Sequence, residues 1–190
     1  GKEYKDVTVI VAHLGGGISV NLHHNGRIED HISDEEGPFS PERAGGLPMF
    51  DVIADCFKEG MTRKDMMKQV KSRGGLMSHL GTTDSRDVEK MIENGDEHAK
   101  LIYDAMILNI AKNVAKLAPG VCGKVDAILL TGGLMRFDDI TAGIRERCGW
   151  IAPITVYPGE MEQEALAYGV LKVLQGKAAA MTYSGRNVWN

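Results

Sequence analysis

Apolar positions in the first third of the chain predict three short strands. Apolar residues alternate or run together in three segments, Val7–Leu14, Ile18–His24 and Arg27–Ile32. Asn25-Gly26 separates the second segment from the third. Asn-Gly favours a type I′ turn, because both central residues of that turn need a positive φ. We therefore predict three antiparallel strands joined by tight turns.

From residue 49 the apolar spacing becomes that of helices. Short amphipathic helices are predicted at Met49–Lys58 and at Thr62–Lys71, where Thr62 is the N-cap and Asp65 its partner in a capping box. Another helix is expected to begin near Ser85. A long helix is predicted at Asp96–Leu117 because apolar residues recur there every three or four positions. These residues are Leu101, Met106, Ile107, Ile110, Val114 and Leu117. The Pro- and Gly-rich segment 34–48 and the segment 72–84, which has a Gly-Gly pair, are predicted to be irregular.

The last third alternates between strand and helix patterns. Strands are predicted at residues 125–133 and 152–159, and helices at Asp138–Arg147 and Glu160–Leu174. This order implies parallel strands added to the sheet through right-handed crossovers. The predicted fold is therefore an α/β, ribonuclease-H-like domain: three antiparallel strands followed by β-α-β-α, with inserted helices. The 190 residues are expected to form a single domain.

Composition excludes several classes of partner. The formal net charge is −4, and no Lys/Arg-rich run is interleaved with aromatic residues, so we expect no nucleic-acid binding. No apolar run approaches the roughly 20 residues of a membrane span, and no signal peptide is recognisable, so a cytoplasmic location is expected. Cys56, Cys122 and Cys148 are odd in number and widely spaced, which favours buried, reduced thiols over disulfides or a zinc site.

Two predicted strands end in glycine, at Gly15–Gly17 and at Gly132-Gly133. Ligands of open α/β sheets bind at the ends of strands, so these are candidate binding sites. Neither segment is a Walker loop or a dinucleotide fingerprint. A tight glycine turn can direct successive N–H groups at phosphate oxygens. It can equally be a plain structural turn, and these residues alone leave both readings open.

Five motifs together carry a resemblance to a known family. They are VAHLGGGISV, EGPFSPERAGGLP, LGTTDSRDVEKM, VDAILLTGGL and VYPGEMEQEALAYG, in this order between about Val7 and Gly176. The chain resembles the C-terminal half of the butyrate kinases of the acetate kinase family. These kinases belong to the superfamily of acetate and sugar kinases, heat-shock ATPases and actin. Leu134 to Phe137 depart from the acetate kinase pattern after the second glycine pair, which favours a butyrate kinase.

The resemblance implies a nucleotide site. His13, Gly15, Gly16 and Gly17 would face the outer phosphates of ATP or ADP. Asp84, Ser85 and Arg86 would line the adenosine pocket, and Gly132, Gly133 and Leu134 would pack against the base. From the residues alone, Asp84–Arg86 could equally be a helix cap with a surface ion pair.

The resemblance also implies catalytic and metal-linked residues. Arg43 would contact the transferring phosphoryl group, and Glu164 would be linked to Mg²⁺, with Glu160 and Glu162 as alternatives. Glu160 could instead simply stabilise a helix N-terminus.

The activity that the resemblance implies is reversible transfer of the ATP γ-phosphoryl group to butyrate, or to a branched short-chain carboxylic acid. Such kinases have a further N-terminal domain that this chain lacks, so the chain alone is expected to be inactive. A homodimer or higher homo-oligomer is also implied. The alternative is a non-catalytic, actin-like module that binds nucleotide or assembles, which would form no acyl phosphate even beside the missing domain.

Overall fold

The computed structural model describes residues 2–159 and 161–182. Its internal contacts divide the chain into two units, residues 1–159 and 160–190. The first unit contains the sheet, and the second contains the last helix, α7 (Glu162–Leu174). The helix predicted at this end of the chain therefore forms. Glu160, at its expected start, lies outside the described residues.

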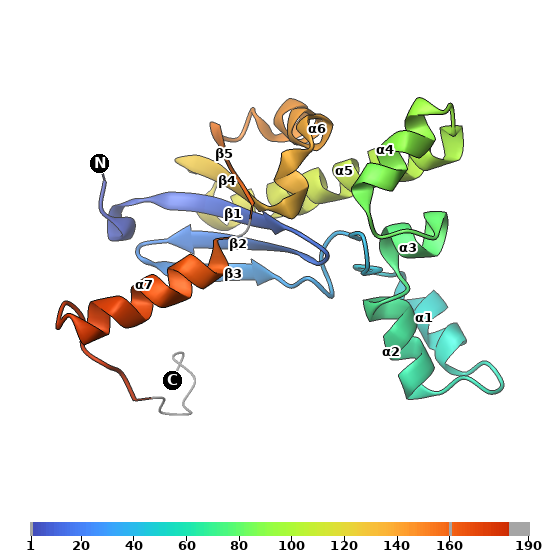
Figure 1. Ribbon diagram of the computed structural model, residues 1–190, viewed down its shortest axis with the longest axis horizontal. Helices are drawn as coiled ribbons and strands as arrows, with labels where there is room; N and C mark the ends of the chain where they lie inside the picture. The colour runs from blue at the N-terminus through green and yellow to red at the C-terminus, as the bar shows by residue number, and fades with distance from the viewer. Residues whose placement is uncertain (1, 160, 183–190) are drawn as a thin grey trace. The chain divides into compact units, whose positions relative to one another are not determined.

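The first unit is built on one mixed sheet in the order β3-β2-β1-β4-β5 (Figure 1). Its strands are β1 (Thr8–Leu14), β2 (Ile18–His24), β3 (Arg27–Ile32), β4 (Ala127–Gly132) and β5 (Ile154–Pro158). The first three strands pair antiparallel, whereas β4 pairs parallel with β1 and β5 parallel with β4. This is the arrangement predicted from the sequence, so the predicted fold class is confirmed.

Strand β1 is central in the sheet, and burial alternates along both β1 and its neighbour β2. Every second residue of β1, and Ile18, Val20 and Leu22 of β2, are buried on the same face of the sheet. The buried apolar pairs across the two strands are Ile10 with Leu22, Ala12 with Val20 and Leu14 with Ile18. At the β2–β3 turn, Asn25 and Gly26 have φ values of 52° and 77°, so the predicted type I′ chemistry is confirmed.

Six helices complete the first unit as the structure describes it. They are α1 (Met49–Cys56), α2 (Arg63–Lys71), α3 (Gly75–Leu80), α4 (Ser85–Glu93), α5 (Glu97–Leu117) and α6 (Asp138–Cys148). Short 3₁₀ helices lie at Tyr4–Asp6, Ala118–Val121 and Gly133–Arg136. Helices α1 and α2 pack together beyond the end of the sheet where β1 turns into β2 (Figure 1). None of the helices within residues 2–159 and 161–182 is long and apolar enough to cross a membrane.

Helix α5 supplies much of the core. It begins after Asp96, whose carboxylate accepts hydrogen bonds from the N–H groups of His98 and Ala99 at 3.0 and 2.9 Å, as expected for its N-cap. Its buried residues are Ala99, Tyr103, Met106, Ile107, Ile110, Ala111, Val114 and Leu117. All of them except Ala99 join the inward side chains of the sheet and Ile140 and Ile144 of α6 in one cluster.

Three expectations from the sequence were wrong. Leu101 was predicted on the apolar face of α5 but is 64% exposed, because Tyr103, two residues further on, faces the core instead. Helix α3 forms within a segment predicted to be irregular, and its Leu76 is buried. The sequence did not reveal this helix because six residues are too few to show helical periodicity. Of the three cysteines, only Cys148 is buried; Cys56 and Cys122 are exposed.

Candidate functional site

The hairpin that joins β1 to β2, which we call the glycine hairpin (Gly15–Gly17), is closely packed at Gly17. The N–H group of Gly15 donates to the carbonyl of Gly17 at 3.0 Å. None of the three glycines adopts a positive φ, so the backbone conformation does not require them. A Cβ on Gly17 would lie 2.7 Å from Asp34 Oδ2 and 3.1 Å from Arg43 Nε. The segment that approaches the glycine hairpin is therefore residues 34–48, the arginine loop.

Two hydrogen bonds attach the arginine loop to the glycine hairpin. Ser40 Oγ donates to the carbonyl of Gly16 at 2.5 Å, and the N–H group of Glu42 donates to the same carbonyl at 3.3 Å. Ser40 Oγ also accepts from the N–H group of Arg43 at 3.1 Å. The contacts therefore hold the residue that the sequence singled out, Arg43, against the predicted phosphate turn.

Backbone contacts with α2 and α3 hold the arginine loop as well. The N–H group of Ala44 donates to the carbonyl of Val70 at 2.9 Å, and that of Leu76 donates to the carbonyl of Ser40 at 3.1 Å. At Gly75 any Cβ would overlap the Ser40 carbonyl oxygen, so only glycine allows this approach. The loop was correctly predicted to be irregular, and it is nevertheless fixed from two directions.

The side chain of Arg43 lies beside the hairpin with its charge only partly compensated. Nε is 3.0 Å from Asp34 Oδ2, which makes an ion pair. The N–H group is not aligned with this oxygen, so Nε is buried without a hydrogen bond. A buried donor left in this way costs about 1–3 kcal/mol. The Arg43 side chain as a whole remains 24% exposed.

Sequence reasoning missed three residues of this arrangement: Asp34, Ser40 and Glu42. Asp34 and Glu42 place carboxylates against Gly17 and Gly16, and Ser40 bonds to both the hairpin and the loop. Their only signal in the sequence is their position in the loop that carries Arg43. Neighbouring polar residues share that position, so the sequence could not select these three.

The end of β4 meets the start of the glycine hairpin. Gly132 has a φ of 100°, and a Cβ there would overlap the carbonyl oxygen of Leu14, the last residue of β1. His13 lies opposite Thr131 in the parallel pairing of β1 with β4. The two glycine-ended strands predicted as binding sites therefore end side by side at one edge of the sheet.

After Gly132 the chain turns into a 3₁₀ helix that begins at Gly133. The side chain of Leu134, expected beside the base, is 6% exposed and belongs to the core cluster. The contacts proposed for Gly132, Gly133 and Leu134 with a base stay predictions.

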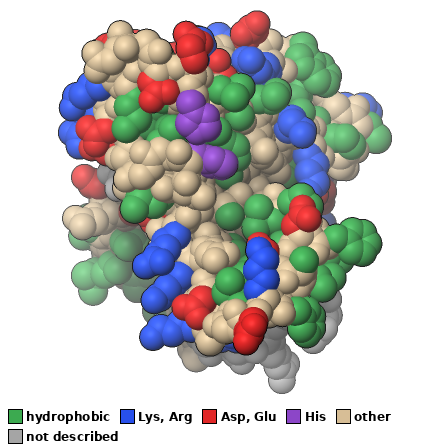
Figure 2. Space-filling model, turned by 90° about the vertical axis from the view of Figure 1, so that its right-hand side faces the viewer, with side chains coloured by type: hydrophobic (Ala, Val, Ile, Leu, Met, Phe, Trp, Pro, Cys, Tyr) green, Lys and Arg blue, Asp and Glu red, His purple; other side chains and the backbone are tan. Residues whose placement is uncertain are grey.

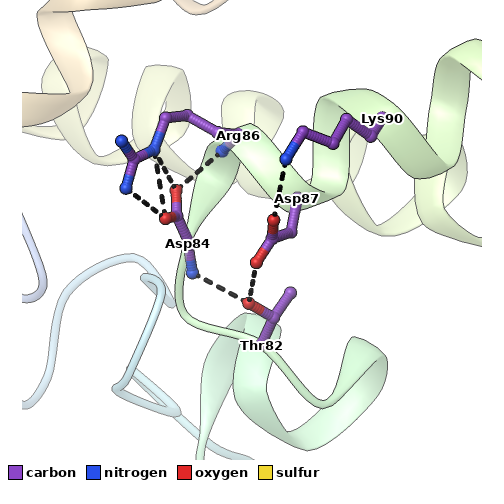
Figure 3. A network of polar contacts seen from close by, with 5 residues as sticks. All are labelled: Thr82, Asp84, Arg86, Asp87 and Lys90. Atoms are coloured by element: carbon purple, nitrogen blue, oxygen red, sulfur yellow. Dashed lines mark hydrogen bonds and ion pairs between the residues drawn. The ribbon is translucent and has the colours of Figure 1, made fainter.

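Asp84 and Arg86 form a local network at the start of α4 (Figure 3). Asp84 is the N-cap and accepts from the N–H group of Arg86 at 2.9 Å, while the guanidinium of Arg86 donates to both carboxylate oxygens. These side-chain hydrogen bonds lower the pKa of the Asp84 carboxyl from 3.8 to about 2. Thr82, Asp87 and Lys90 continue the network along the helix.

Ser85, between these two residues, is only 3% exposed, and its Oγ has no hydrogen-bond partner. The contacts of Asp84 and Arg86 are those of a capped helix with a surface ion pair, the simpler of the two readings that their residue types allowed. The adenosine role of Asp84, Ser85 and Arg86 stays a prediction.

A cleft of about 530 Å³ lies on the α2 and α3 side of the arginine loop. Phe39, Arg73, Gly75 and His79 are among its lining residues, and the rings of Phe39 and His79 are 6.3 Å apart. Figure 2 looks onto the side of the molecule that carries α1 to α4, where basic side chains are interspersed with acidic and hydrophobic ones. On the face drawn there, they form no continuous basic strip of the kind that tracks a nucleic-acid backbone.

The donor set fits a nucleotide phosphate better than it fits a metal held by this chain alone. The Arg43 guanidinium, a permanent cation beside the glycine hairpin, is suited to anionic oxygens. Within residues 2–159 and 161–182, no three His, Cys, Asp or Glu side chains come together to hold a metal ion. Mg²⁺ usually takes one or two carboxylates besides phosphates and water, so this finding is compatible with Mg²⁺ bound to a nucleotide.

Glu164 and its alternative Glu162 lie in the first turn of α7, in the second unit. Glu160, the other alternative, lies outside the described residues. The metal role of Glu164 therefore stays a prediction.

Comparison with known proteins identifies the family. The model of the acetokinase family matches residues 1–148. The chain belongs to this family. It is 46% identical over 185 residues to a probable butyrate kinase of Bacteroides thetaiotaomicron, a match that covers 96% of this chain and 52% of the relative. It is 43% identical over 184 residues to butyrate kinase 2 of Clostridium acetobutylicum, covering 96% and 52%.

Solved structures of this acetokinase family share the fold. The chain matches the acetate kinase of Porphyromonas gingivalis with a TM-score of 0.81 and 21% identity, covering 90% of this chain and 50% of the other. The acetate kinase of Entamoeba histolytica matches with a TM-score of 0.78 and 18% identity, covering 88% and 52%. The chain spans about half the length of the relatives it matches.

Proposed function

We propose that this chain is the nucleotide-binding C-terminal half of a two-domain carboxylate kinase. The complete kinase transfers the γ-phosphoryl group of ATP reversibly to butyrate, or to a branched short-chain acid, and yields an acyl phosphate and ADP. The observation that carries the proposal is the attachment of Arg43 to the glycine hairpin through the arginine loop. The relatives at 43–46% identity are named as butyrate kinases, which supports butyrate as the acid.

The chemistry of phosphoryl transfer suits this arrangement. A carboxylate oxygen of the acid attacks the γ-phosphorus in line, the bond from that phosphorus to the bridging oxygen breaks, and ADP leaves with the electron pair. No proton has to be removed from the acid, which is already ionised at neutral pH. Catalysis then depends on positioning and on neutralising charge over the phosphoryl oxygens. The Arg43 guanidinium supplies a fixed positive charge, and the N–H groups of the glycine hairpin supply donors without charge.

Mg²⁺, when bound with the nucleotide, adds charge neutralisation at the β- and γ-phosphates. Glu164 is the residue of this chain that we propose is linked to it. The other half of the kinase provides most of the acid pocket and the remaining phosphate contacts, and the assembled kinase is a homodimer or larger homo-oligomer.

Calorimetric titration of ADP with Mg²⁺ into this chain tests the nucleotide site first. We expect binding by the wild type, and binding at least about tenfold weaker for Arg86→Ala and Gly133→Val, because each removes or blocks a predicted contact. Arg63→Ala removes an exposed arginine at the start of α2 and is the matched control, with unchanged binding expected.

The complete kinase tests the reaction. With ATP, Mg²⁺ and butyrate we expect butyryl phosphate, trapped as its hydroxamate. If ADP binds but no short-chain acid yields an acyl phosphate, the kinase proposal is wrong and the chain is a non-catalytic nucleotide-binding module.

A further inference from the structure

Ser40 occupies a central place in the contacts around Arg43. It is fully buried, and its hydroxyl both donates to the Gly16 carbonyl at 2.5 Å and accepts from the Arg43 N–H group at 3.1 Å. Its own N–H group donates to the carbonyl of Arg43 at 3.0 Å. The backbone of Arg43 is therefore bonded to Ser40 on both its donor and its acceptor side, and one hydroxyl connects it to the glycine hairpin.

Asp34 acts at the other end of the same residue. Its Oδ2 lies 3.0 Å from Arg43 Nε, and both atoms occupy the space that a side chain at Gly17 would fill. Asp34 is 40% exposed, so it contributes little to the core. Its position limits the directions in which the guanidinium can point.

We propose that Ser40 and Asp34 are positioning residues for Arg43. Ser40 fixes how far the Arg43 backbone lies from the glycine hairpin, and Asp34 fixes the direction of the Arg43 guanidinium. The proposal rests on the proposed function, in which Arg43 contacts the transferring phosphoryl group. Neither Ser40 nor Asp34 needs to touch the substrate.

Other contacts hold the arginine loop in place without the Ser40 hydroxyl. They are backbone hydrogen bonds from Ala44 to Val70, from Gly74 to Glu42 and from Gly46 to Gly37. Removing the hydroxyl is therefore expected to leave the loop folded and to release Arg43 locally. A displacement of about 1 Å at a catalytic group can lower a rate by about 100-fold.

A double-mutant cycle in the complete kinase separates positioning from general structural support. Ser40→Ala is expected to lower kcat about 10- to 100-fold while KM for MgATP changes less than about threefold, because the contact of Arg43 strengthens in the transition state. In an Arg43→Ala background the same substitution should change kcat less than about twofold. Asp34→Asn should lower kcat about threefold or more in the wild-type background and should have no such effect in the Arg43→Ala background.

Ser72→Ala is the matched control, because Ser72 Oγ donates only to the Lys68 carbonyl in the last turn of α2. Its kcat should stay within about twofold of the wild type. Circular dichroism melting of each variant verifies that it is folded.

Equal losses with and without Arg43 would overturn the proposal, because Ser40 and Asp34 would then act on something else. An Arg43→Ala kinase as active as the wild type would overturn it too, together with the role proposed for Arg43.

Failure of the proposed function is detected separately, as a wild-type kinase that forms no acyl phosphate. In that case the ¹⁵N chemical shift of Arg43 Nε, measured in this chain, tests whether Ser40 and Asp34 position Arg43. It should shift in both Ser40→Ala and Asp34→Asn, and an unmoved resonance would overturn the proposal.

Discussion

Gly132 lies so close to the carbonyl oxygen of Leu14 that no side chain fits between them. The contact joins the last residue of β4 to the last residue of β1, at the edge of the sheet where the glycine hairpin begins. Gly132 also has a φ of 100°, which L-residues rarely adopt. Backbone strain and lack of space therefore act at the same position.

Gly132→Ala should destabilise the chain strongly. We expect a loss of about 2–4 kcal/mol in the free energy of unfolding, because the substitution combines an unfavourable φ with a steric overlap. Urea unfolding followed by circular dichroism measures it. Gly60→Ala is the control: Gly60 has a φ of 77° but open space around it, so only about 1–2 kcal/mol should be lost. Equal losses at the two positions would show that the overlap with Leu14 contributes nothing.

Gly17→Ala should reduce activity more than stability. Its Cβ would meet side-chain atoms of Asp34 and Arg43 rather than backbone, so these side chains must shift and the free energy of unfolding should fall by only about 1 kcal/mol. Arg43 would be displaced, and phosphoryl transfer by the complete kinase should fall at least about tenfold. Gly16→Ala, whose Cβ would meet only the Glu42 carboxylate at 3.3 Å, should have the smaller effect on rate. A larger effect at Gly16 would contradict this arrangement.

The Asp84–Arg86 pair should make stability depend on pH in the acid range. The pKa of Asp84 is lowered from 3.8 to about 2 in the folded chain, so its contribution is complete above pH 3.8 and is lost as the pH falls through about 2. Asp84→Asn keeps a good N-cap but removes the ion pair. Urea midpoints of the wild type and this variant should therefore differ most above about pH 4 and converge near pH 2. A difference independent of pH would show that the charge of Asp84 is not involved.

Two of the three cysteines should react with a thiol reagent in the folded chain. Cys56 and Cys122 are exposed, whereas Cys148 is buried, its Sγ donates to the Ala111 carbonyl at 3.4 Å, and burial raises the pKa of its thiol. Titration with dithionitrobenzoate should release two equivalents of thiolate quickly and the third only in denaturant. In Cys148→Ala the fast count should stay at two and the denatured count should fall to two. Three fast thiols in the wild type would contradict the burial of Cys148.

Local patterns predicted most of the fold. The Asn25-Gly26 turn, the caps Thr62 and Asp96 and the alternation in β1 and β2 depend on residues near one another in the chain, and each is confirmed. Helix α3 could not be predicted in the same way, because six residues carry no periodic signal. Its position depends on the hydrogen bond that the Leu76 N–H group donates to the Ser40 carbonyl, and Ser40 lies far from α3 in the sequence.

The candidate site was also predictable only in part from the sequence. Its glycine turns and Arg43 were visible as residue types in an order that resembles a family. Asp34, Ser40 and Glu42 were not, because nothing in a Pro- and Gly-rich segment distinguishes a polar residue that contacts the hairpin from one that faces water.

The strands, the helices with strong periodicity, the fold class and the family could all be predicted from the amino-acid sequence. These follow from side-chain period, from turn and cap chemistry, and from motifs in order. The folded chain was needed to show that Arg43 lies beside Gly17, that Ser40 joins the arginine loop to Gly16, and that Gly132 meets Leu14. Such contacts join segments distant in the chain, and they depend on space left by an absent Cβ and on the direction of single hydrogen bonds. Neither of these is encoded in local spacing.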